Sequence, residues 1–198
     1  MKKSRLKPDQ ILHAIDFSER LTDTKLWLRM ADDLIAAANI LEIEVVKYWS
    51  EIQFENNRIV KISNRKYVQG AYSLLIAYAL ENYFKALLIH RNIESLKGKL
   101  LTKLPKYLSS HNLCQLASKS KFKHDLSEED LLSRLSRSSI WAARYPIPVE
   151  PNALNAIHIL SNGKAHLAAF YSPNDINHIH NFINRLRNYV LTEIENNE

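Results

Sequence analysis

A small group of polar side chains in the middle of the sequence has the chemical types needed to bind an anion and move a proton. Glu81 and Lys85 stand one helical turn apart in an otherwise apolar stretch, and a charge buried there is costly unless it is paired. His111 adds an imidazole suited to acid–base chemistry, and Arg144 adds a planar, anion-binding guanidinium. If their segments converge, they form a polar cluster with both abilities; the alternative is a buried network that only fixes how helices pack. The candidate ligand-binding residues are Glu81, Lys85, His111, Asn112, Arg144 and Tyr145.

Helices are the elements predicted to position this group. Residues 24–52 carry apolar side chains every three or four positions, which predicts one long amphipathic helix with Asp23 or Thr24 as its N-cap. Residues 67–91 are apolar on nearly all sides, a pattern typical of a helix buried at the centre of a bundle. This second helix carries Glu81 and Lys85, so we expect their side chains to lie inside the molecule.

Two further helices are predicted to bring the remaining candidates to the cluster. Residues 109–117 read as a short capped helix that begins near His111. Ser127 begins a sequence that resembles a capping box, and the helix it starts is expected to run to about Arg144. Pro146 ends it, because the residue before a proline is displaced from the helical region.

The rest of the chain supplies one more regular helix and two less regular segments. Residues 172–173 are predicted to begin a last helix, which carries an apolar stripe over residues 176–194. Residues 53–66 are compatible with a short hairpin or with a loop, and the loop is favoured. Residues 149–171 show only a weak helical tendency, at residues 153–160.

These elements predict an all-α fold, an up-down bundle of four to five helices, in a single domain of residues 1–198. The first ~20 residues are expected to form an arm, and residues 146–174 a long irregular connection.

Composition excludes several classes of site. The single Cys114 excludes an internal disulfide and a multi-cysteine zinc site, and we expect it to be an inert buried thiol rather than a nucleophile beside His111. Glycine occurs at three positions only, so neither a Walker loop nor a dinucleotide-binding loop is possible. His178 and His180, two apart on a helix, point in different directions and form no zinc site. We therefore expect no metal and no cofactor.

The charged N-terminus and the most apolar stretch of the sequence both predict a cytoplasmic protein that does not enter membranes. The charged N-terminus leads into no apolar core, which argues against a signal peptide. The most apolar stretch, residues 71–89, contains charged side chains and is too polar for an ordinary membrane span.

Charge is segregated along the chain, which has a formal net charge of +6. Residues 95–124 contain seven lysines and no acid, whereas residues 32–55 contain six acids and one lysine. Such segregation predicts attraction of an acidic partner, including nucleic acid, to one face; the alternative is a solvated loop on an ordinary basic protein. The candidate nucleic-acid-binding residues are Lys97, Lys99, Lys103, Lys106, Lys119, Lys121 and Lys123.

Three short stretches together resemble the HEPN superfamily of helical-bundle proteins. They are ALENYFKALL at residues 79–88, HNLCQLA at residues 111–117 and RYP at residues 144–146. Their order is similar to that of small prokaryotic members, and the resemblance implies a bundle of four or five helices, frequent homodimers and a role around RNA in toxin–antitoxin or antiphage systems. Catalytic members carry Arg, four to six residues, then His; here Arg5 and His13 are separated by seven residues, and Arg144 and His158 by thirteen.

The residues and the resemblance leave three functions open. The first is a non-catalytic, dimeric binding module for RNA, a nucleotide or a partner protein. The second is a metal-independent ribonuclease toxin with a displaced site, in which His111 is the general base and Arg144 stabilises the charged phosphorane. The third is a purely structural dimerisation subunit, with the stripe over residues 176–194 as the seam between two copies; the favoured alternative for this stripe is packing within its own bundle.

Overall fold

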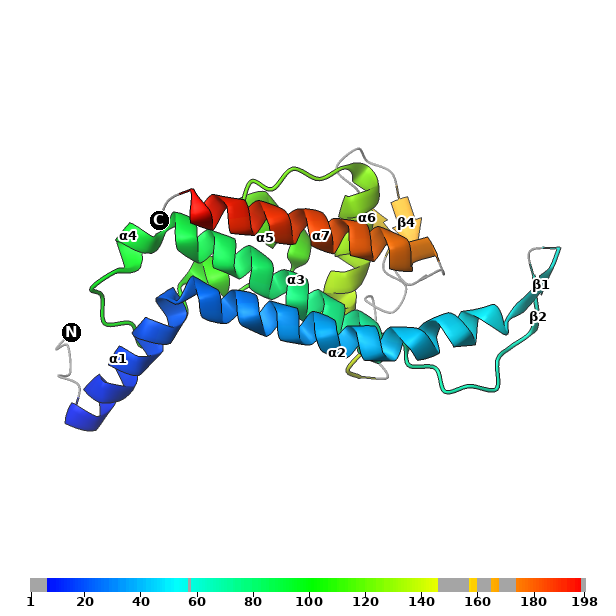
Figure 1. The fold of residues 1–198 in the computed structure, drawn as a ribbon, viewed down its shortest axis with the longest axis horizontal. Coiled ribbons are helices and arrows are strands. Elements are labelled where there is room, and N and C mark those ends of the chain that lie inside the picture. Colours follow the sequence, from blue (N-terminus) through cyan, green and yellow to red (C-terminus); the bar gives the residue numbers. More distant parts are fainter. Residues whose placement is uncertain (1–6, 57, 146–156, 160–164, 168–173, 197–198) are drawn as a thin grey trace.

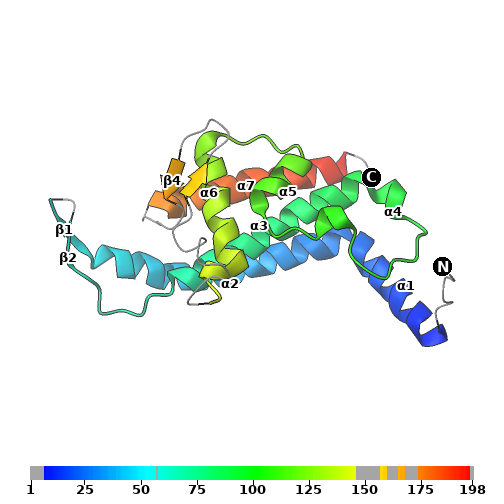
Figure 2. The same cartoon turned by 180° about the vertical axis from the view of Figure 1, so that it is seen from behind.

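The computed structural model describes residues 7–56, 58–145, 157–159, 165–167 and 174–196, and the described part is an all-α bundle, as predicted. Long helices lie side by side, with shorter ones packed across their rear face (Figures 1 and 2). The helices are α1 Pro8–Thr22, α2 Thr24–Ser50, α3 Gln69–Arg91, α4 Ile93–Leu96, η1 Lys106–Leu108, α5 Leu113–Lys119, α6 Leu126–Arg137, η2 Ser138–Ala142 and α7 Asn174–Glu195.

Helix α3 is the centre of the bundle, which confirms the prediction made from its apolar surface. It packs against α1, α2, α5, α6 and α7, and most of its side chains from Tyr72 to Ile89 are buried. Helix α2 runs antiparallel to α3, whereas α7 lies beside α3 and runs in the same direction (Figures 1 and 2). A helix surrounded in this way has no solvent-facing side, so its sequence carries no polar stripe.

Local capping explains where the helices begin. The Asp23 carboxylate accepts a hydrogen bond from the Leu26 backbone N–H at 3.1 Å, so Asp23 is the N-cap of α2. The capping box predicted at Ser127 is wrong: it is formed two residues earlier, by Asp125 and Glu128. Asp125 takes the N-cap position because its carboxylate reaches the Glu128 N–H at 2.9 Å, and α6 then continues into the π-helical turn η2 rather than to Arg144.

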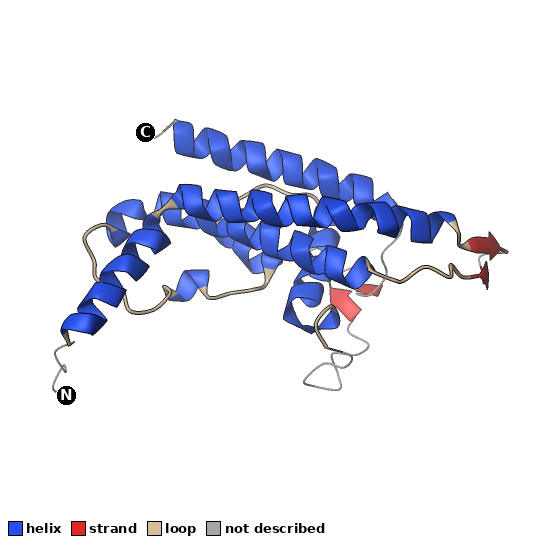
Figure 3. Cartoon of the chain, turned by 60° about the horizontal axis from the view of Figure 1, so that its bottom comes forward, coloured by secondary structure: helices blue, strands red, loops and turns tan. Residues whose placement is uncertain are grey.

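Residues 53–61 form an antiparallel hairpin, so the loop favoured from the sequence is wrong for this segment. Strands β1 Gln53–Glu55 and β2 Arg58–Lys61 pair with an irregularity in register after Gln53. Asn56 has a φ of 50°, a left-handed conformation in which asparagine is enriched, and the β-branched Ile59 and Val60 favour an extended strand. The hairpin projects beyond the end of α2 (Figure 3).

A second short hairpin, β3 Ile157–Ile159 with β4 Ala165–Leu167, lies in the region predicted to be weakly helical. The prediction is wrong for residues 157–159, because each backbone pairs with a neighbouring strand instead of along a helix. Residues 153–156 and 160, the connection from residue 146, and the start signal at residues 172–173 lie outside the described residues.

The two ends of the chain differ in how tightly they pack. The predicted N-terminal arm is the helix α1, which leaves the bundle at an angle to α2 (Figure 1). The apolar stripe of α7, from Ile176 to Ile194, is buried inside the bundle. That stripe is therefore not available as a seam between two copies of the chain.

Candidate functional site

The centre of the candidate site is a carboxylate that contacts two basic side chains. Glu81 and Lys85 form an ion pair inside the bundle, with Nζ and Oε1 2.6 Å apart and only 9% and 5% of the side chains exposed. The His111 ring stands at its outer side, with Nδ1 3.0 and 3.1 Å from the two carboxylate oxygens. Three of the residues predicted to converge are thus in contact. His111 itself is 61% exposed, so it covers the buried ion pair and faces solvent.

The position of His111 is fixed by the backbone around the start of α5. Asn112 is the N-cap, and its side chain accepts the Gln115 N–H at 3.0 Å, so its side-chain oxygen is used in capping. The next N–H, of Leu113, donates to the Ser136 hydroxyl on α6 at 2.8 Å. The first bond caps α5 and the second joins its start to α6, so the backbone directly after His111 is anchored.

The contact with Glu81 assigns the histidine tautomer. A carboxylate accepts hydrogen bonds, so the proton of His111 is placed on Nδ1, which donates to Glu81. The other ring nitrogen, Nε2, is then an acceptor on the exposed part of the ring. General bases in enzymes use this arrangement, in which a carboxylate orients an imidazole through its Nδ1. Once protonated, Nε2 donates a hydrogen bond to phosphate.

Arg144 and Tyr145 form a separate exposed pair next to this centre. The Arg144 guanidinium lies over the Tyr145 ring, 5.1 Å from its centroid, and donates to its hydroxyl at 3.1 Å. Arg144 also donates to the Ser139 carbonyl at 3.4 Å, while the Ser139 hydroxyl donates to the His111 carbonyl at 3.5 Å. Within the described residues, Arg144 is thus connected to the backbone of His111 through Ser139, and no hydrogen bond joins it to the imidazole.

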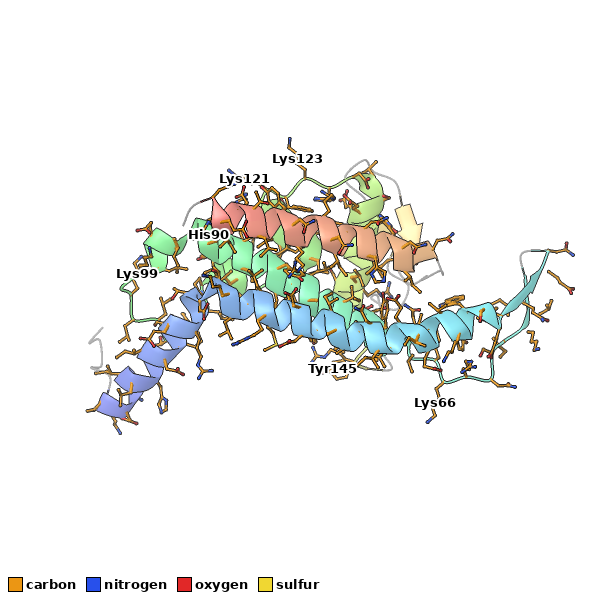
Figure 4. The ribbon with its side chains drawn as sticks, viewed as in Figure 1. Lys66, His90, Lys99, Lys121, Lys123 and Tyr145 are labelled. Atoms are coloured by element: carbon orange, nitrogen blue, oxygen red, sulfur yellow. The ribbon has the colours of Figure 1, made fainter. Side chains whose placement is uncertain are left out.

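All seven lysines of residues 97–123 are exposed, as a phosphate-binding role requires. They do not form one compact patch. Lys99 lies near α4 at one end of the bundle, whereas Lys121 and Lys123 lie along the edge next to α7 (Figure 4). Tyr145 is on the opposite edge, below α2, so Arg144 and these two lysines do not face the same small ligand.

Lys121 is directed outward by a helix-ending motif that the sequence did not reveal. Its φ of 52° is left-handed, its N–H donates to the Ser118 carbonyl, and the Phe122 N–H donates to the Ala117 carbonyl. This is a Schellman motif, which usually has glycine where Lys121 stands. Phe122 is turned into the core by the same motif, and its burial holds the flanking lysines at the surface.

Sequence reasoning missed the polar contacts that tie α2, α3 and α7 together. Asp32 accepts two hydrogen bonds from Arg187, at 2.9 and 3.0 Å, and a further one from the Tyr83 hydroxyl. Arg187 is the largest cause of the lowered pKa of Asp32. The signal for these ties was the presence of tyrosines in an otherwise apolar helix, because a buried tyrosine hydroxyl needs a partner.

A second tie of the same kind stands near the other end of these helices. Glu42 on α2 accepts from the Tyr72 hydroxyl at 3.2 Å and contacts His180 Nε2 at 2.8 Å. Burial raises the pKa of the Tyr72 hydroxyl, and Glu42 adds to the rise. His180, weighed in the sequence as a metal ligand, thus contacts Glu42.

The remaining chemical candidates lie apart from His111. Burial raises the pKa of the Cys114 thiol to about 12, and its Sγ is 3.7 Å from the Glu129 carbonyl. Cys114 borders an open cavity of about 830 Å³ that His124 and Asp125 also line. Among the described residues, no three His, Cys, Asp or Glu side chains are grouped as metal ligands would be.

No described helix is both long and apolar enough to span a membrane. Comparison with known proteins gives no significant match: no family model, no curated protein and no solved structure matches this chain.

Proposed function

We propose that this chain is a non-catalytic RNA-binding module of the HEPN-like kind, acting as a homodimer in the cytoplasm, within a toxin–antitoxin or antiphage-type system. The observation that carries the proposal is the exposure of every lysine in a stretch of the chain, residues 95–124, that contains no acid. Because phosphates bind mainly through such cations, this segment is the natural contact for a nucleic acid.

The spread of these lysines favours an extended ligand over a mononucleotide. Lys99 and Lys123 lie at different places along the bundle (Figure 4). Of the seven lysines, Lys97 is the one for which the described structure gives an ion pair, with Glu94 at 2.9 Å. A single-stranded RNA following the segment from α4 to the end of α5 reaches several of them at once, and exposed His111 lies on that course.

The test measures binding of a short fluorescein-labelled single-stranded RNA by fluorescence anisotropy, at about 50 mM and about 200 mM salt. Replacing Lys121 and Lys123 by Gln is expected to weaken binding and to reduce the slope of log K against log salt by about 1.4, because each lost phosphate contact removes about 0.7. The matched control replaces Lys61 and Lys66, two exposed lysines near the projecting hairpin, and is expected to change the slope far less. Binding that ignores salt, or equal effects of the two pairs, contradicts the proposal; tight binding of ATP or another mononucleotide instead points to a compact site.

One observation favours a ribonuclease as the second candidate. Glu81 holds Nδ1 of His111 at 3.0 Å, which leaves Nε2 exposed to take a proton from a ribose 2′-hydroxyl. The resulting oxygen attacks the adjacent phosphorus, the bond from phosphorus to the 5′-oxygen breaks, and the 5′-oxygen takes a proton from water, giving a 2′,3′-cyclic phosphate and a free 5′-hydroxyl. In this scheme Arg144 stabilises the charge on the phosphorane. Cleavage of total RNA by the purified protein, abolished by His111→Ala and by Glu81→Gln, supports this candidate, and intact RNA with the natural chain rejects it.

A further inference from the structure

Large aliphatic side chains are exposed along α2 and at both of its ends. On α2 itself Ile40 is 71% exposed and Ile43 57%, on α1 Leu12 is 68% exposed, and beside the hairpin Ile62 is 64% exposed. A contiguous patch of exposed apolar side chains marks an interaction surface.

The exposed residues of α2 form a face opposite the one that packs on α3. Ala36, Ile40 and Ile43 follow one another at spacings of four and three, whereas Ala38 and Val45 point into the core. Helix α3 is the main packing partner of α2. We call Ala36, Ile40, Ile43 and the charged residues on either side the outer face of α2, a helix about 40 Å long; the three named residues are all exposed.

Two pairs of charges on this outer face match when a second copy of the helix is packed against it in the reverse direction. Asp33 and Lys47 each lie seven positions from Ile40, and Arg29 and Glu51 each lie eleven positions from it. Two copies of α2 packed antiparallel with Ile40 at the centre place every acid of these pairs opposite a base of the other copy. The existing contacts of Lys47 with Glu44 and of Glu51 with Arg65 are surface ion pairs, which are weak enough to be shared or exchanged.

We propose that the outer face of α2 is a homodimer interface, in which two antiparallel copies of α2 cross at Ile40 and Asp33 of each chain pairs with Lys47 of the other. This deepens the homodimer in the proposed function and is independent of RNA binding. The two-fold symmetry follows from the sequence pattern, since one patch contacts its own copy in such an interface.

Further exposed aliphatic residues lie beyond the two ends of α2. The hairpin and α1 leave opposite ends of α2 toward opposite sides (Figure 1). At the α1 end, Leu26, Trp27 and Met30 line an apolar cavity of about 300 Å³. At the other end, Ile59 of the hairpin and Ile62 beside it are exposed.

The test is a charge reversal followed by light scattering and sedimentation equilibrium at tens of micromolar protein. The natural chain is expected to have twice the 23.0 kDa mass of one chain. Asp33→Lys alone and Lys47→Asp alone each turn two attractive contacts into two repulsive ones, and each is expected to weaken the dimer about tenfold or more. Mixing the two variants, or combining both changes in one chain, restores opposite charges at both contacts and is expected to restore the dimer. Asn184→Lys, at an exposed position of α7, is the control and is expected to leave the dimer intact.

A cysteine at the symmetry axis gives a second readout that does not depend on charge. In a Cys114→Ser background, Ile40→Cys is expected to form an intermolecular disulfide on mild oxidation, because both copies of residue 40 meet. Ser50→Cys, at the end of α2, is expected not to, since its two copies are about 30 Å apart. A monomeric natural chain overturns both this interface and the proposed homodimer. A dimer that ignores the charge reversals and does not cross-link at residue 40 overturns the α2 interface alone, and RNA binding is measured separately in either case.

Discussion

Removing Glu81 is predicted to destabilise the protein by stranding the Lys85 ammonium in the core. The Lys85 side chain is 5% exposed, and its ammonium donates a hydrogen bond to Glu81 at 2.6 Å. Breaking such a buried pair by truncating one partner costs about 3–5 kcal/mol. For a chain of this length that corresponds to a fall in Tm of about 6–20 °C. Urea unfolding of Glu81→Ala, followed by circular dichroism, measures the loss.

The same contacts predict the stability of the other two variants of a double-mutant cycle on Glu81 and Lys85. Lys85→Met is expected to cost less than Glu81→Ala, because the Glu81 carboxylate keeps the His111 ring as a partner. The double variant, with Glu81→Leu and Lys85→Met, leaves no buried charge and is expected to lie within about 1 kcal/mol of the natural chain, or above it. His111 then loses its contact but is exposed enough for water to replace it.

A matched control is provided by Asp16 and Arg20, an acid and a base with the same spacing on α1. Their side chains are 63% and 70% exposed, so Asp16→Ala is expected to lower the free energy of unfolding far less than Glu81→Ala does. If Glu81→Ala is no more harmful than Asp16→Ala, then Lys85 reaches solvent once its partner is gone. That result refutes the view that a buried ion pair supports the His111 site.

Further predictions concern acid stability, a buried ion pair and the thiol. Arg187 holds the pKa of Asp32 below its usual value. The stability contributed by the ionised Asp32 is present above about pH 4 and is lost as the pH falls through the lower folded-state pKa. Asp32→Asn should therefore reduce the dependence of the free energy of unfolding on pH in acid. Arg134→Gln should cost about 3–5 kcal/mol in urea unfolding, because Asp175 loses two buried hydrogen bonds of 2.9 Å. Cys114, whose pKa burial raises to about 12, should react with Ellman's reagent at pH 8 far more slowly in the folded protein than in denaturant; equal rates would contradict its burial.

Helix positions followed from local sequence patterns, whereas the hairpins did not. The spacing of apolar residues predicted α2 and α3, because a helix repeats every 3.6 residues and a long helix shows this period in its sequence over many turns. The hairpin at residues 53–61 has strands of three and four residues, too short for a periodic signal. Its turn depends on the left-handed conformation of Asn56, which the sequence permits but does not require.

The sequence predicted which residues belong to the site, but it predicted only some of the contacts between them. Glu81 and Lys85 are neighbours by helical geometry alone, and their burial follows from the apolar residues around them. The contact of His111 with Glu81 joins positions thirty residues apart and depends on how α5 is anchored to α6. Arg144 was expected in the same cluster, but α6 changes to a π-helical turn at Ser138, and the guanidinium lies over the Tyr145 ring.

The sequence by itself determined the all-α class, the central helix and the segregation of charge, because each of these depends on residue types and on spacings within one element. Only the tertiary structure decided which side of each helix is covered. It buried the regular stripe of α7 and left that of Ile40 and Ile43 on α2 exposed. The stripe of α7 has six large apolar residues, whereas the outer face of α2 has only Ala36, Ile40 and Ile43 between charged residues. The first packs inside the bundle, while the second points away from α3.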